Sequence, residues 1–113
     1  LNLTERERLV KDLGPTHRTL ILRNHGMLTL GRDVAEAFIL MRNLECACQA
    51  QIAFQATGMP ISEVPADVCE HTARQYEVSV EKHRRDPENS SLTLEWNALV
   101  RRLSPPDATS HRD

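Results

Sequence analysis

Residues 20–31, which read LILRNHGMLTLG, contain two short apolar runs separated by a polar turn. The first run, which begins one residue earlier and covers residues 19–24, lies between chain-breaking residues and predicts a strand that is buried on both faces. The second run, residues 27–30, predicts another short strand, which ends at Gly31. Gly26 suits the tight turn between them because it has no Cβ to clash with the backbone. The stretch therefore predicts two strands that flank a turn at residues 24–26.

Helical patterns precede and follow these strands. Thr4 and Glu7 form a capping-box pattern for a first helix, which Gly14 is expected to end. Asp33 and Glu36 form a second start signal. Apolar residues then recur at spacings of three and four up to about residue 57, which predicts one long helix.

Two further amphipathic segments complete the pattern. The third helix is predicted to start near Pro65, and the fourth to run from about Leu92 to Leu103. The inventory is therefore α/β, with two short strands and about four helices. A two-stranded sheet is barely stable alone, and a doubly buried strand implies neighbouring strands. We therefore expect an incomplete piece of a larger domain, with the other strands upstream or on another chain, and not a complete enzyme by itself.

Composition excludes several classes of function. Basic residues number 14 and acidic residues 16, so the chain lacks the excess of positive charge that favours binding to nucleic acid. No apolar run approaches the roughly 20 residues needed to span a membrane. The cysteines, Cys46, Cys48 and Cys69, are odd in number and without framework spacing. We therefore expect the three cysteines to act as small apolar residues in or near the core. Their number and spacing also indicate a reducing, cytoplasmic location.

His25 is the candidate site residue, because it follows a strand and sits in a glycine turn, where α/β sheets present ligand-binding groups. Imidazole is also the commonest metal ligand in proteins. The alternative is a purely structural histidine at a strand end. A catalytic zinc usually takes about three protein ligands. The chain contains no H-x-H, H-E-x-x-H or C-x-x-C motif that would supply the others.

The same residues carry a family resemblance. Residues 20–31, followed by VAEAF at 34–38 and LECAC at 44–48, resemble the class II aldolase/adducin family, and look closer to its adducin-like bacterial branch than to the sugar-phosphate aldolases. The resemblance covers about residues 5–58. It implies the C-terminal part of a three-layer α/β/α domain at residues 1–58, a helical extension at 59–104 and a flexible tail at 105–113.

The resemblance also implies a chemistry. Enzymes of this family bind a divalent metal, usually zinc, through three histidines, of which only the histidine of the His-Gly turn maps here, onto His25. Asn24 and Gly26 would shape the turn that presents this ligand. In these enzymes an upstream H-x-H motif supplies the other two ligands, and an upstream glutamate transfers the proton. Neither the motif nor the glutamate has a counterpart in this sequence.

Two functions therefore stay open. The first is part of a metal-dependent aldolase-like lyase that acts on a small hydroxy-carbonyl, sugar-phosphate-like compound and assembles as a homo-oligomer, a tetramer by family analogy. The second is a non-catalytic, self-associating adducin-like domain. A third reading is an unrelated α/β fragment whose His-Gly turn is coincidental.

Overall fold

The computed structural model describes residues 2–103, which form four helices and two strands and confirm the predicted α/β class. In chain order the elements are α1 (Leu3–Leu13), β1 (Thr19–Leu22), β2 (Gly26–Thr29), α2 (Val34–Ala56), α3 (Ala66–Arg85) and α4 (Ser91–Leu103). They divide into two compact units, one ending at Ile52 and the other beginning at Ala53. The division expected at residue 58 stays a prediction, and the expected tail at 105–113 lies outside the described residues.

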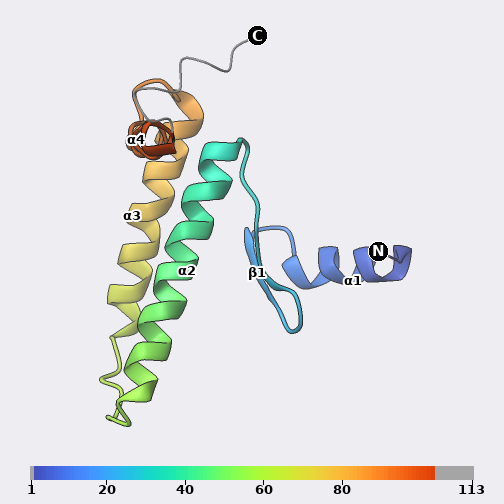
Figure 1. Ribbon diagram of the computed structural model, residues 1–113, viewed down its shortest axis with the longest axis vertical. Helices are drawn as coiled ribbons and strands as arrows, with labels where there is room; N and C mark the ends of the chain where they lie inside the picture. Colours follow the sequence, from blue (N-terminus) through green and yellow to red (C-terminus); the bar gives the residue numbers. More distant parts are fainter. Residues whose placement is uncertain (1, 104–113) are drawn as a thin grey trace. The chain divides into compact units, whose positions relative to one another are not determined.

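β1 and β2 form an antiparallel hairpin (Figure 1). Leu22 pairs with Gly26 beside the turn, and Thr19 pairs with Thr29 at the open end. One further bond, in which the Leu30 N–H donates to the Arg18 carbonyl at 2.8 Å, extends the pairing beyond the strands.

The expectation that the first strand is buried on both faces is wrong for the described residues. Ile21, in the middle of β1, is 69% exposed. A hydrogen bond from Thr29 and a sulfur contact from Met27 join β2 to α2, and these two residues lie two apart in the strand and so face the same side. Thr19, Leu20 and Leu22 are half-buried, so β1 is partly covered but is not buried on both faces.

α2 starts as its sequence predicts. The Asp33 carboxylate accepts a hydrogen bond from the Glu36 N–H at 2.8 Å, which satisfies one of the free donors of the first turn. The Thr29 hydroxyl donates to the Ala37 carbonyl at 2.9 Å, and the Cys48 thiol lies 3.9 Å from the Met27 sulfur. The helix therefore contacts β2 both in its first turns and in its middle.

α1 starts differently from its prediction. Its N-cap is Asn2, whose carbonyl accepts hydrogen bonds from the N–H groups of Glu5 and Arg6, and no side chain caps the helix. Thr4 therefore lies inside the helix and cannot serve as the cap. The predicted end is confirmed, because Gly14 follows the helix with a φ of 66°.

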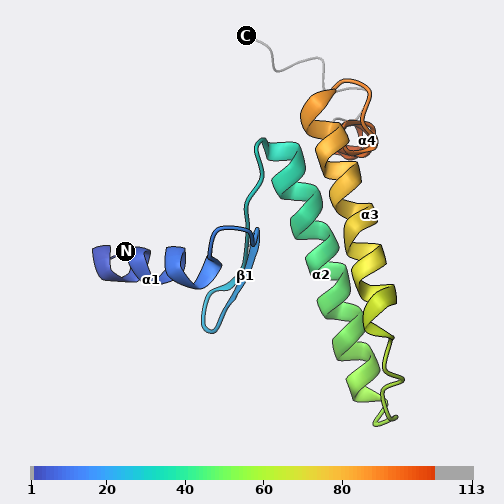
Figure 2. The same cartoon turned by 180° about the vertical axis from the view of Figure 1, so that it is seen from behind.

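In the second unit α4 lies against α3 (Figure 2), and a small core lies between the two helices. Val80 and Leu92 are buried there, together with His83, which is 2% exposed. The His83 Nδ1 lies 2.7 Å from the Ser90 hydroxyl, and this hydroxyl also accepts a bond from the Thr93 N–H at 3.1 Å. Ser90 therefore caps α4 and joins it to α3 through a buried imidazole.

The cysteines lie further from the core than expected. Cys46 and Cys69 are exposed and Cys48 is half-buried, and none of the three forms a disulfide. Positions 46 and 48 point to different sides of α2, so only Cys48 faces the hairpin. Among the described helices, none is long and apolar enough to cross a membrane.

Candidate functional site

The predicted site lies at the closed end of the hairpin. Residues 23–25 form the turn that leads into Gly26, whose φ is 101°. A Cβ built on Gly26 would meet no atom within 4 Å, so the glycine is required by backbone conformation and not by crowding. The turn geometry expected for Asn24 and Gly26 is therefore present, whereas the part it plays in ligand binding stays a prediction.

His25 lies on the surface of this turn, as does Asn24. Among residues 2–103, no hydrogen bond or ion pair engages the His25 side chain. An imidazole that packs as a structural group normally has a partner for its ring nitrogens, as His83 has in the second unit. The placement of His25 is therefore that of a group open to a ligand from outside the hairpin.

The other histidines do not join it. His17 precedes β1, at the opposite end of the hairpin, and its Nδ1 lies 3.1 Å from the Leu13 carbonyl. His71 and His83 belong to α3 in the other unit. In the described part of the chain, no three His, Cys, Asp or Glu residues cluster closely enough to hold a metal ion. These residues alone do not fit a three-ligand metal site, and His25 could supply one ligand at most.

The open end of the hairpin holds a buried carboxylate that the sequence did not predict. Glu36 is 1% exposed. Its Oε1 accepts a hydrogen bond from Arg18 Nη1 at 2.9 Å, and its Oε2 accepts one from the Arg32 N–H at 3.1 Å. The sequence pattern indicated only that Glu36 stands in the first turn of a helix. Its ion-pair partner lies 18 residues away, which no local spacing reveals.

Gly31 lies in the same region and is tightly enclosed. A Cβ there would lie 2.5 Å from the Ala37 nitrogen and 3.0 Å from the Asp33 carbonyl oxygen. The chain can therefore pass this close to the start of α2 only without a side chain at position 31. The sequence identified Gly31 as a strand end but not as a point of close approach.

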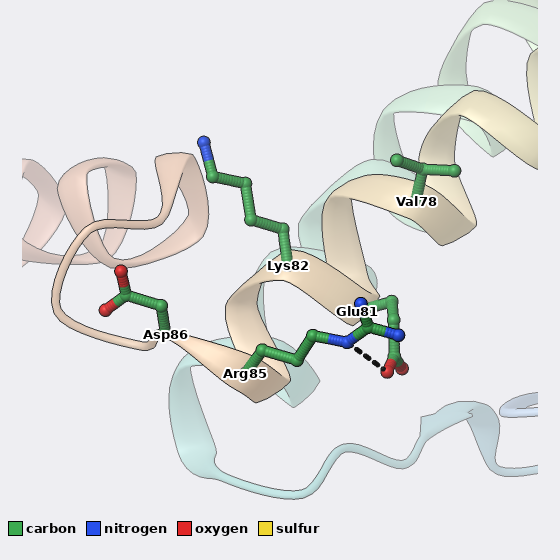
Figure 3. Close-up of a pocket in the computed structure, with 5 residues that line it drawn as sticks. All are labelled: Val78, Glu81, Lys82, Arg85 and Asp86. Carbon is green, nitrogen blue, oxygen red and sulfur yellow. Dashed lines mark hydrogen bonds and ion pairs between the residues drawn. The ribbon is translucent and has the colours of Figure 1, made fainter.

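The second unit has a surface hollow of about 330 Å³ on α3, lined by Val78, Glu81, Lys82, Arg85 and Asp86 (Figure 3). The Arg85 guanidinium pairs with Glu81 at 3.1 Å inside it. Both signs of charge are present, and no residue of the predicted site contributes. The hollow therefore gives no support to a second ligand site.

Comparison with known proteins agrees with these features. Residues 2–52, which include α1, the hairpin and most of α2, match the family model described as the class II aldolase and adducin N-terminal domain. The chain belongs to the class II aldolase/adducin family through this segment.

Its relatives include both branches of the family. A Pseudomonas aeruginosa protein named "Putative aldolase class 2 protein" is 36% identical over 103 residues, which are 91% of this chain and 38% of that protein. A Caulobacter vibrioides protein of the same name is 48% identical over 58 residues, 51% of this chain and 22% of that protein. β-Adducin of Rattus norvegicus is 50% identical over 48 residues, 42% of this chain and 7% of that protein. The chain thus spans well under half the length of each of these relatives, and no solved structure matches it.

Proposed function

We propose that this chain is the His25-bearing part of a metal-dependent class II aldolase-like lyase. The proposed substrate is a small hydroxy-carbonyl compound, and the expected ion is zinc. The supporting observation is the combination of family membership with an exposed histidine on a glycine turn whose side chain no described residue engages. Zinc accepts imidazole nitrogen readily and polarises carbonyl oxygens when bound.

The contribution of the described residues is limited to presenting one ligand. Gly26 supplies the backbone conformation of the turn, and His25 supplies the imidazole. The remaining ligands and the proton-transferring group would come from segments outside residues 2–103 or from another copy of the chain. For this reason no chemical step is assigned to residues of the described hairpin beyond the binding of a metal.

Metal analysis tests this proposal. The purified protein, the variant His25→Ala and the matched control His71→Ala, which removes an exposed histidine from α3, are compared for bound zinc by elemental analysis. We expect about one ion per chain in the unmodified protein and the control, and loss of that ion in His25→Ala. Equal zinc in all three samples would exclude His25 as a ligand.

A second candidate function is a non-catalytic, self-associating module of the adducin kind. The observation that supports it is the 50% identity to β-adducin over 48 residues, which is similar to the 48% identity to the Caulobacter vibrioides protein over 58 residues. This function requires no metal. Absence of bound metal in a protein that still self-associates during analytical ultracentrifugation would support it, and the absence of metal is the result that distinguishes it from the lyase.

Homo-oligomerisation is proposed under both functions, with a tetramer as the family expectation. Several large apolar side chains of α2, including Val34, Phe38 and Ile52, are exposed in the isolated chain. Exposed apolar groups of this size favour association when they gather on one surface.

A cytoplasmic location is proposed under both functions, because none of the three cysteines forms a disulfide.

A further inference from the structure

Both chain segments that flank the hairpin converge on one buried carboxylate. Arg18 directly precedes β1 and binds Glu36 Oε1, and Arg32 follows β2 and donates its N–H to Glu36 Oε2. Glu36 itself lies in the first turn of α2, whose N-cap Asp33 accepts the Glu36 N–H. A single residue therefore ties the entry of the hairpin, its exit and the start of the long helix together.

The burial of Glu36 indicates a geometric role. Removing a carboxylate from water costs several kcal/mol, and a partner charge offsets that cost without a large surplus. Arg18 remains 24% exposed, so it keeps part of its hydration while it pairs. An ion pair of this kind contributes less to stability than its Coulomb energy suggests, but it fixes the relative position of the groups that it joins.

The hairpin needs such an anchor because two strands alone are barely stable. Four register pairs separate the anchored end from the turn, so His25 lies about 13 Å or more beyond it at the usual rise per strand residue. Along that length the Thr29–Ala37 hydrogen bond and the Met27–Cys48 sulfur contact also join the hairpin to α2, and Ile39 of α2 is buried. The hydrogen bonds to a charged group, which are the stronger contacts that orient the ribbon, therefore lie at its open end.

We propose that Glu36 is a positioning residue, which fixes the hairpin against α2 and thereby fixes where the His25 turn stands. The importance of this role for metal binding rests on the proposed function, whereas the positioning itself does not. Glu36 lies at the end of the hairpin opposite to the turn. It acts through Arg18 and the Arg32 N–H, at the far end of the ribbon.

Amide hydrogen exchange on the full chain tests the proposal. Glu36→Gln keeps the shape of the side chain and removes its charge, and Glu45→Gln is the matched control, because Glu45 is an exposed residue of the same helix that binds Gln49. We expect the amides of β1 and β2 to exchange about tenfold faster in Glu36→Gln, since a hydrogen bond to a charged group is lost. The amides of residues 44–50 in α2 should keep their rates, and the control should change neither set. Equal acceleration of both sets would overturn the proposal, because it would show a general loss of stability.

Backbone ¹⁵N relaxation gives a second readout that a general stabilising role would not change. The order parameters of Asn24, His25 and Gly26 should fall in Glu36→Gln relative to the control, and unchanged values would contradict positioning. If Glu36→Gln does not fold, Arg18→Met tests the same bond from the other side, and it should loosen the same three residues. Neither readout involves a metal. If the proposal that His25 binds zinc proved wrong, the result for Glu36 would therefore still stand.

Discussion

The two ends of the β1–β2 hairpin are built in opposite ways. At the open end, Glu36 is 1% exposed and binds both flanking segments, and Gly31 passes within contact distance of α2. At the turn, His25 is exposed, and Gly26 has empty space where a side chain would lie. In the first unit, the buried carboxylate therefore holds the open end of the ribbon, while the candidate ligand at the turn stays accessible.

The largest expected effect comes from removing the anchor. Glu36→Ala leaves Arg18 without its partner carboxylate, so we expect the free energy of unfolding to fall by about 3 kcal/mol, the lower range for breaking a buried ion pair. Glu45→Ala, at an exposed position of the same helix, should change it by less than about 0.5 kcal/mol. Urea denaturation followed by circular dichroism measures both, and similar losses would refute the anchoring role of Glu36 at the open end.

A somewhat smaller effect is expected from crowding the open end. Gly31→Ala places a Cβ 2.5 Å from the Ala37 nitrogen, which backbone atoms can relieve only by moving. We expect a loss of about 2 kcal/mol, typical of overpacking at a closely packed point. The same urea titration measures it, and a loss no larger than that of an exposed alanine substitution would show that the segment is not held closely.

At the turn, a glycine substitution should cost less. Gly26→Ala meets no neighbouring atom but must adopt a φ near 101°, so we expect a loss of about 1 kcal/mol from backbone strain alone. Gly58→Ala is the matched control, because Gly58 also has a positive φ and open space around it. A loss at Gly26 that exceeds the loss at Gly31 would reverse the comparison.

The smallest effect on stability is expected at the candidate ligand. His25→Ala removes an exposed side chain without a described partner, so the free energy of unfolding should change by less than about 0.5 kcal/mol. Loss of bound zinc, together with an unchanged stability of the metal-free protein, would be the signature of a ligand. A large fall in the unfolding midpoint would instead indicate a structural histidine.

Local signals in the sequence were enough to predict the elements. The Asp33 cap starts α2 at Val34, and the helix ends at Ala56, within a residue or two of the expected boundary. Gly14 ends α1 as expected. These features depend on neighbours a few residues away, and capping and turn chemistry act over that distance.

Features that depend on distant partners could not be predicted in this way. Glu36 is buried because Arg18 reaches it across the hairpin, and His83 is buried because Ser90 follows the turn after α3. Neither residue differs in local pattern from an exposed polar residue on a helix. The exposure of Ile21 was missed for the opposite reason, since an apolar run shows that a strand can be covered but not that this chain covers it.

The six residues from Gly31 to Glu36 also limit how the chain could change in length. One inserted residue between the Asp33 cap and Glu36 would turn the carboxylate by about 100° around the helix axis, away from Arg18. Residues 57–65, in contrast, are exposed throughout and join α2 to α3 without such a constraint. Insertions and peptide tags should therefore be accepted in that connection, whereas the segment between the hairpin and α2 has a fixed length.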